Sequence, residues 1–291
     1  MDKKVGIVMT TYNNGDIIAK TFDSIISQDY KNSILVVADD GSTDKTYEVM
    51  EKYAENNKNI FLTKLPHLER GIARKTAIDI AKKEGCEYLF IIDSDMKLKD
   101  GLIFDCVNYL EADSTLGALV IPEIPFSDYN NYFSKVRVFE REIINNAGKY
   151  LDKNSIEAAR FWKMDAYDSS GGLNPNQIAF EETQPTIRYV ENGGKIERAV
   201  FTGVHHDEKM VTLKNLVKKK SYYFSVMPKT LSTEKKGMKK ALARWYFFRP
   251  VLYRGSNILR YIKHPLLAIG MFYMYIILTF VAVKEIIKNK N

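Results

Sequence analysis

Residues 90–101 read FIIDSDMKLKDG, a short apolar run that is followed by Asp93 and, two positions later, by Asp95. Residues 88–92 predict a buried strand, and two carboxylates just beyond its end can point toward one site. Carboxylate oxygens suit a hard divalent cation and leave coordination positions for phosphate oxygens. Pairs of aspartates are also common on protein surfaces. The neighbouring sequence is therefore needed to distinguish a metal-binding site from a solvated turn.

The chain on either side alternates between β-branched runs and amphipathic stretches. Further strands are predicted at residues 5–9, 34–38, 60–63 and 116–121, and helices at residues 16–28, 44–56, 71–84 and 101–111. This alternation is typical of βα units in a doubly wound α/β sheet, which binds ligands at the carboxyl ends of its strands. Residues 122–180 lose the alternation, and we expect helix and loop lying over the sheet there.

Polar residues also follow the first two predicted strands, as TTYNN at 10–14 and DDGSTD at 39–44. With Asp93 and Asp95 this makes three polar clusters at three strand ends, where such a sheet binds its ligand. A pyrophosphate with Mg²⁺ or Mn²⁺ is the ligand that they favour. The glycine, serine and threonine after Asp40 equally suit a tight turn into a capped helix.

Length, charge and cysteine content limit the domain organisation and the classes of function that the chain can have. The 291 residues can form one main domain and a smaller element, and the net charge of +7 favours an anionic partner. Cys86 and Cys106 stand outside any CxxC or Cys/His cluster, so we expect buried thiols in a reducing cytosol. Neither GxGxxG nor GxxxxGK[ST] occurs, which argues against dinucleotide oxidoreductases and P-loop NTPases.

The C-terminal part predicts contact with a membrane. Residues 265–283, PLLAIGMFYMYIILTFVAV, carry no charge and are nearly long enough to cross a bilayer. Basic and aromatic residues alternate before this run, which favours lipid over nucleic acid as partner. Their positive charge predicts a membrane-associated protein with a cytoplasmic catalytic domain. A helix lying in the interface and an oligomerisation helix remain alternatives, the latter in a homo-oligomer.

The chain resembles the inverting family-2 glycosyltransferases with a GT-A fold. The resemblance rests on TTYNN at 10–14, VVADDGSTDKT at 36–46, RGIARKTAIDIAKKEG at 70–85, FIIDSDMKLKDG at 90–101, SGGLN at 170–174 and FEETQPTIRYVENGGKI at 180–196. It implies an α/β, Rossmann-like mixed sheet flanked by helices, and a nucleotide diphosphate sugar donor of UDP or GDP type. We expect a catalytic domain at 1–212, a basic amphipathic interfacial region at 213–263, and a transmembrane or membrane-associated helix at 264–291.

The resemblance also implies roles for the residues that would bind the donor nucleotide. Thr10 and Tyr12 match positions that line the nucleotide pocket, where the tyrosine ring offers a stacking face for the base. Asp39 and Asp40 match the pair that hydrogen-bonds the base and the ribose. A tyrosine that merely packs at a strand end is the structural alternative for Tyr12.

The diphosphate and the metal have their own set of implied residues. Asp93 and Asp95 match the DxD motif, the first reaching the ribose and the second the metal, which would be Mn²⁺ or Mg²⁺. His206, with His205 the weaker candidate, resembles the late histidine that completes the metal or pyrophosphate shell. Arg70 and Arg74 stand where a guanidinium could contact pyrophosphate, and a solvated helix face is the structural alternative for their charges.

Inversion needs a base that takes the proton of the acceptor hydroxyl. Glu182 is the candidate, followed by Glu181, because the two precede Arg188 at the spacing of the family's ED-x-x-x-x-x-R stretch. The family more often has aspartate at the position of Glu182, and asparagine at that of Lys75. An acidic first turn of a helix is the structural alternative.

A membrane location suggests an acceptor held at that surface: a polyprenyl phosphate, a lipid-linked saccharide or a surface glycan. Two other functions stay open at this point. A nucleotidyltransferase would need a similar nucleotide pocket and would release pyrophosphate, and a non-catalytic scaffold that binds nucleotide sugars would release no product.

Overall fold

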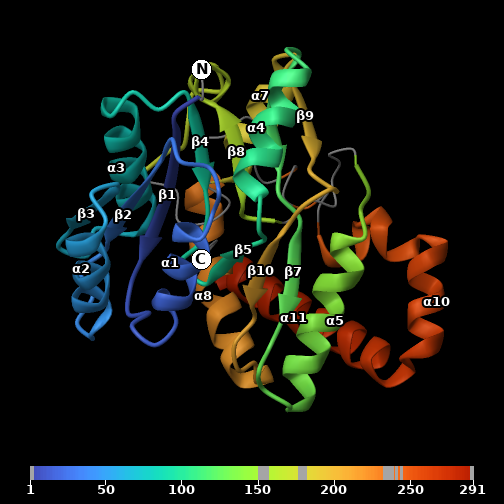
Figure 1. Ribbon diagram of the computed structural model, residues 1–291. Helices are drawn as coiled ribbons and strands as arrows, with labels where there is room; N and C mark the ends of the chain where they lie inside the picture. Colours follow the sequence, from blue (N-terminus) through green and yellow to red (C-terminus); the bar gives the residue numbers. More distant parts are fainter. Residues whose placement is uncertain are drawn as a thin grey trace. The chain divides into compact units, whose positions relative to one another are not determined.

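The predicted alternation of strands and helices is present along residues 5–120 (Figure 1). The structure, a computed structural model, describes residues 3–149, 157–175, 182–231 and 245–288, together with Lys239 and Leu242. The chain forms two units, of which the first comprises Met1–Glu123, Glu157–Asn176 and Phe180–His206. The second comprises Ile124–Ile156, Gln177–Ala179 and Asp207–Asn291.

The first unit is built on a seven-stranded sheet with the strand order β3-β2-β1-β4-β8-β6-β9. Its strands are β1 (Val5–Thr11), β2 (Ser33–Asp39), β3 (Ile60–Lys64), β4 (Tyr88–Ile91), β6 (Leu116–Val120), β8 (Arg160–Lys163) and β9 (Lys195–Arg198). The strand β8 runs antiparallel to β4 and β6, whereas the other pairs are parallel. The mixed sheet that the resemblance implies is therefore confirmed.

The strand β8 corrects the expectation that residues 122–180 only cover the sheet. Phe161 lies opposite Phe90 of β4 on one side and opposite Leu119 of β6 on the other, so β8 is a central strand. It has four residues and begins and ends with a charged side chain, and so lacks the apolar run that predicts its neighbours. The helices α5 (Tyr132–Asn145) and α6 (Met164–Ser169) do occur in this segment.

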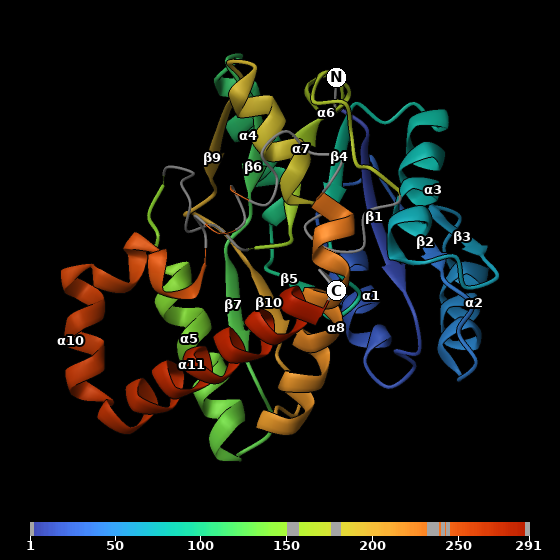
Figure 2. The same cartoon turned by 180° about the vertical axis from the view of Figure 1, so that it is seen from behind.

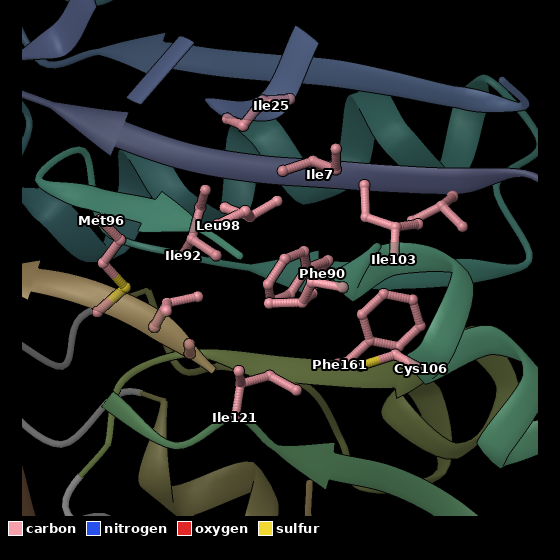
Figure 3. Close-up of a cluster of buried hydrophobic side chains, with 14 of the residues drawn as sticks. Ile7, Ile25, Phe90, Ile92, Met96, Leu98, Ile103, Cys106, Ile121 and Phe161 are labelled. Atoms are coloured by element: carbon pink, nitrogen blue, oxygen red, sulfur yellow. The ribbon is translucent and has the colours of Figure 1, made fainter. Parts of the chain in front are cut away.

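Within its described residues, the first unit has the helices α1 (Ile18–Ile26), α2 (Thr46–Asn56), α3 (Arg70–Lys83), α4 (Leu102–Ala112), α6 and α7 (Thr183–Glu191). On one face of the sheet, buried residues of α1 and α4 form a core with alternate strand residues. Figure 3 shows Phe90 and Phe161 of the sheet with Ile103 and Cys106 of α4 in this core. Both cysteines are buried and free, as expected.

The opposite face of the sheet is covered by α3, which packs on β1 and β2 (Figure 2). Small residues permit this close approach, because Ala73, Ala77 and Ala81 of α3 are buried. A Cβ atom at Gly6 would lie 2.8 Å from the Cβ of Ala81. The close packing fixes the start of α3, and with it two arginines of the candidate site.

A short second ladder continues beyond β4. The strand β5 (Met96–Leu98) pairs antiparallel with β10 (Val204–Asp207), which places His206 opposite Met96. The strand β7 (Glu123–Phe126) begins in the first unit and continues into the second. None of these three strands follows from the alternation of apolar residues, because their sequences MKL, EIPF and VHHD contain charged or imidazole side chains or a proline within three or four residues.

The helices that the structure describes in the second unit are α5, α8 (Leu213–Leu231), the short 3₁₀ helices η1 (Tyr246–Phe248) and η2 (Pro250–Tyr253), α10 (Gly255–Lys263) and α11 (Pro265–Lys288). The helix α11 packs against α5 and α8. By length and composition, α11 could cross a membrane, with a mean hydropathy of 2.4. Its start at Pro265 coincides with the start of the predicted apolar run.

We predict that Gly117→Ala destabilises the first unit by about 1–3 kcal/mol, because overpacking forces a shift of the surrounding side chains. A Cβ atom at Gly117 would lie 2.2 Å from the Tyr189 hydroxyl and 2.7 Å from the Ala166 Cβ. Tyr189 also packs edge-on against Trp162, with ring centroids 5.6 Å apart. Denaturant unfolding measures the effect, and Gly255→Ala, with no atom within 4 Å, is the control. Equal stability of the two variants would contradict this packing.

Candidate active site

The turn between β4 and β5 carries Asp93 and Asp95 beyond the end of a central strand. Two hydrogen bonds hold it in place through Ser94. The Asn14 side-chain amide donates to the Ser94 hydroxyl at 2.7 Å, and the Thr21 hydroxyl donates to the Ser94 carbonyl at 2.9 Å. Because Asn14 belongs to the polar cluster after β1, two of the predicted strand-end clusters are in direct contact.

Two arginines of α3 surround Asp93 with positive charge. Arg74 is 1% exposed, and its guanidinium donates to the Asp93 carboxylate at 2.6 Å. Burial by itself would raise the pKa of Asp93, but the charges of Arg70, Arg74 and His206 outweigh burial and hold it well below its usual value. Asp93 is therefore ionised at neutral pH, which is the form of a carboxyl group that binds a cation.

His206 lies between two carboxylates of the first unit. Its Nε2 atom is 3.5 Å from Asp95 Oδ1, and its Nδ1 atom is 2.8 Å from Glu123 Oε2. Glu123 is 3% exposed, and its other oxygen accepts the Ala158 amide at 2.7 Å. Glu123 thereby fixes the ring and leaves Nε2 directed at Asp95, which is how a second carboxylate commonly orients a metal-binding histidine.

His205 is directed away from this cluster. Successive strand residues point to opposite faces, so His205 and His206 cannot both face Asp95. Burial, followed by the nearby charges of Lys99 and Lys97, lowers the pKa of His205.

Glu182 joins the same group of charges from the start of α7. One of its oxygens, Oε2, lies 3.7 Å from Arg70 and 3.8 Å from Arg74, and the side chain is 13% exposed. Arg74 therefore lies within ion-pair distance of both Glu182 and Asp93, which brings this carboxylate close to the DxD turn in the same unit. Glu181 lies outside the described residues.

Further along α7, Arg188 supports the loop that contains SGGLN. Its guanidinium donates to the carbonyl of Ser170 at 2.9 Å and also to the carbonyl of Gly172. Gly171 and Gly172 have φ values of +78° and +61°, which glycine adopts at little cost. The Arg188 side chain thus links two of the stretches on which the resemblance rests: SGGLN at 170–174 and the stretch at 180–196 to which Arg188 belongs.

A second group of residues lies at the ends of β1 and β2. Tyr12 is 45% exposed, and its ring stacks on His67 with centroids 4.5 Å apart and an interplanar angle of 26°. The hydrogen bond of His67 to the Asp40 carbonyl raises the pKa of the imidazole. An exposed aromatic stack of this kind offers a face to a planar base.

The other residues predicted to contact the nucleotide are more buried. Asp40 is 5% exposed and accepts the Leu68 amide at 2.6 Å. Asp39 is 0% exposed and accepts both the amide and the hydroxyl of Ser42, so its carboxylate closes the turn after β2. Thr10 is 8% exposed on β1. In this structure Asp39 shapes the loop, while Tyr12 presents the most accessible surface.

Glu123 and His67 contact residues of the candidate site but are not predicted from the sequence. Glu123 follows β6, so the strand-end rule that selects Asp93 could have selected it as well. His67 stands in the connection between β3 and α3 with a φ of +39°. No spacing along the chain relates His67 to Tyr12. They meet because β1 and β3, which they follow, both pair in parallel with β2.

Solved structures with the same fold include glycosyltransferases. Mannosyltransferase PcManGT from Pyrobaculum calidifontis, solved with GDP-Man and Mn²⁺, matches with a TM-score of 0.63 and 16% identity, over 98% of this chain and 88% of that one. Residues 1–349 of Staphylococcus aureus TarS, solved with UDP, match with a TM-score of 0.57 and 15% identity, over 87% of this chain and 72% of that one. The GT-A fold is thereby confirmed.

Sequence relatives agree with the fold. The poly(ribitol-phosphate) beta-N-acetylglucosaminyltransferase TarP of Staphylococcus aureus is 28% identical over 185 residues, 55% of this chain and 54% of that protein. The UDP-Glc:alpha-D-GlcNAc-diphosphoundecaprenol beta-1,3-glucosyltransferase WfaP of Escherichia coli is 29% identical over 130 residues, 44% of this chain and 46% of that protein. The chain spans about half the length of these two relatives. The family model for glycosyl transferase family 2 matches residues 6–169, and the chain belongs to this family.

Proposed function

We propose that the chain is an inverting glycosyltransferase that moves a sugar from a nucleotide diphosphate sugar to a membrane-associated acceptor. The observation that carries the proposal is the charged cluster of the first unit. It combines the DxD aspartates, a histidine held by a buried glutamate, two arginines and a further carboxylate: Asp93, Asp95, His206, Glu123, Arg70, Arg74 and Glu182. Such a set suits a diphosphate leaving group, because it provides both cation ligands and cationic side chains.

The donor set fits a divalent metal. Asp95 and His206 present an oxygen and a nitrogen 3.5 Å apart, a combination that Mn²⁺ accepts and that Mg²⁺ accepts with more oxygen ligands. Asp93 and Asp95 with His206 would hold the ion. A bound cation there supplies positive charge to the departing diphosphate.

The donor binds at the edge of the sheet where β1 and β2 end. Tyr12 stacks on the base, Thr10 lines the pocket, and Asp39 and Asp40 act on the base and the ribose, Asp39 through the turn that it closes. At the diphosphate end, Arg70 and Arg74 neutralise phosphate charge that Asp93 alone would repel. The donor nucleotide is of UDP or GDP type.

Glu182 acts as the base in this proposal. Its carboxylate takes the proton from the acceptor hydroxyl while that oxygen attacks the anomeric carbon from the face opposite the leaving group. Glu181 is the alternative base. An acceptor that is already an ionised phosphate would need only orientation by the carboxylate.

The acceptor and the location form the remaining part of the proposal. A lipid-linked saccharide, a polyprenyl phosphate or a membrane glycan is consistent with the apolar helix α11 and with the acceptor in the name of the WfaP relative. Residues 1–212 form the catalytic domain on the cytoplasmic side, residues 213–263 the basic interfacial region, and residues 264–291 the membrane-associated helix. A homo-oligomer is compatible with this arrangement.

We predict that Glu123→Gln weakens Mn²⁺ binding roughly 10- to 100-fold, which is the usual effect of losing the partner of a metal-binding histidine. Glutamine keeps an oxygen for the Ala158 amide but removes the negative charge beside His206. The Mn²⁺ concentration for half-maximal activity measures the effect, and the rate at saturating Mn²⁺ should stay close to that of the wild type. A lower rate at every Mn²⁺ concentration, with unchanged half-saturation, would show a structural role instead.

The test of the proposed function is a screen of UDP and GDP sugars with Mn²⁺ or Mg²⁺, with and without a membrane lipid extract. We expect nucleoside diphosphate release that depends on the metal and increases with the extract. Release of pyrophosphate would identify a nucleotidyltransferase, and the absence of any product with every donor would favour a binding scaffold.

A further inference from the structure

The helix α11 has a continuous outer row of apolar side chains. The row recurs at intervals of three and four residues, which places its members on one side of a helix. They are between 47% and 71% exposed: Leu266, Ile269, Tyr273, Ile276, Phe280, Val283 and Ile287. The preceding helix α10 adds Ile258, Leu259 and Ile262, which are 48%, 61% and 70% exposed. We call these ten residues the outer row.

The opposite side of α11 packs against α5 and α8, two helices of the same unit that carry many charged residues. The buried Tyr275 hydroxyl donates to Glu140 of α5 at 2.9 Å, and Glu140 pairs with Arg137. A Cβ atom at Gly270 would lie 2.4 Å from the Tyr132 hydroxyl and 2.7 Å from Val136, so α11 lies very close to α5. This inner side cannot face lipid without breaking these contacts.

These contacts oppose a transmembrane position, although 24 residues at 1.5 Å each give about 36 Å, enough to cross a bilayer. A crossing α11 would carry α5 and α8 into the hydrocarbon. Both helices bear many charges, including Arg137, Arg141 and Glu142 on α5 and the run Lys218, Lys219 and Lys220 on α8. Ionised side chains are strongly disfavoured at the bilayer centre.

The charge of the C-terminal part points to an anionic surface. Residues 209–291 contain only two acidic residues, Glu234 and Glu285, against many lysines and arginines. Arg254 and Lys263 are exposed at the two ends of α10, beside the apolar residues of the outer row. Apolar side chains flanked by basic ones are typical of helices that lie in the interface of a membrane with anionic lipids.

We propose that α10 and α11 lie in the plane of an anionic membrane, with the outer row in the acyl region, and that α11 does not cross the bilayer. The inference concerns the mode of attachment, which the proposed function leaves open, and it does not depend on the sugar-transfer chemistry. The acceptor would then be taken from the leaflet on which the chain lies.

A second copy of the chain is the competing occupant of the outer row, because intervals of three and four residues are typical of a coiled-coil seam. A seam in water is flanked by charged residues that pair across the interface. Residues 265–283 contain no charged residue, and the outer row continues onto α10 beyond any single seam. A lipid surface can therefore cover the whole outer row, whereas a second copy of the chain would cover only the part on α11.

Flotation of the full chain with preformed vesicles tests the occupant. We expect binding to vesicles that contain phosphatidylglycerol and weaker binding to phosphatidylcholine alone. The triple variant Ile262→Ser, Leu266→Ser and Phe280→Ser should reduce the bound fraction about tenfold or more. The control Phe104→Ser, on α4 and 49% exposed, should bind like the wild type. Vesicle binding unchanged in the triple variant, with a halved mass by light scattering, would overturn the proposal in favour of a second copy.

Thiol labelling in inside-out membrane vesicles tests whether α11 crosses. Lys263→Cys and Lys288→Cys place single thiols just before and at the end of α11, and the native cysteines are buried. Both thiols should react with a membrane-impermeant maleimide from the outside. Reaction of only one until the vesicles are opened would overturn the in-plane position. Nucleoside diphosphate release by the triple variant without vesicles is measured separately, so a failure of sugar transfer is distinguishable from a failure of attachment.

Discussion

Asp95→Ala is expected to reduce metal-dependent release of nucleoside diphosphate by roughly 10³-fold, the effect of removing a group that stabilises the charge of the leaving diphosphate. Asp95 Oδ1 lies 3.5 Å from His206 Nε2, so the variant removes the oxygen of this pair of candidate metal ligands. Steady-state kinetics over a range of Mn²⁺ concentrations measure the change, and added metal should not restore the rate.

The control for this variant is Asp100→Ala, which removes an exposed carboxylate five residues further along the chain. It should release product at the wild-type rate. An Asp95→Ala enzyme as active as Asp100→Ala would contradict the assignment of the metal site, because the two variants change the net charge of the chain equally.

Glu182→Gln is expected to lower kcat by about 10²- to 10⁴-fold, the range for loss of a general base, with a smaller change in KM for the donor. Glutamine keeps the shape of the side chain near Arg70 and Arg74 but cannot accept the proton. Initial rates with a hydroxyl acceptor measure the effect.

Glu191→Gln serves as the control for this second variant, because Glu191 is exposed at the last turn of the same helix α7. It should leave kcat unchanged. A Glu182→Gln enzyme with the wild-type kcat would move the role of base to Glu181 or indicate an acceptor that is already ionised.

The strands β1, β2 and β6 follow from the sequence because nearly all of their residues are buried, which requires a continuous apolar run. The edge strand β3 is only partly buried and follows from its run of Ile60, Phe61 and Leu62. Each of the predicted strands 5–9, 34–38, 60–63 and 116–121 overlaps an observed strand to within two residues at either end. The central strand β8 does not follow, since Arg160 and Lys163 enclose only two apolar residues. Its place in the sheet depends on tertiary pairing of Phe161 with Phe90 and Leu119, which no local pattern records.

Part of the candidate site follows from the strand-end rule, because parallel strands bring their carboxyl ends to one edge. The rule places Asn14 and Ser94 at the same edge, and the structure joins them by a hydrogen bond. The rule does not predict that the Asp39 carboxylate accepts a hydrogen bond from Ser42 in the turn after β2, nor that Glu123 contacts His206. Those details depend on side-chain direction at short strands, where one residue more or less reverses the face.

The position of Mn²⁺ in crystals grown with the ion and UDP or GDP tests the central claim most directly. Anomalous scattering at the manganese edge should give a peak bonded to Asp95 and His206 in the wild type and no peak there in Asp95→Ala. A manganese peak at another place in the molecule, with none within bonding distance of Asp95 and His206, would contradict this metal site.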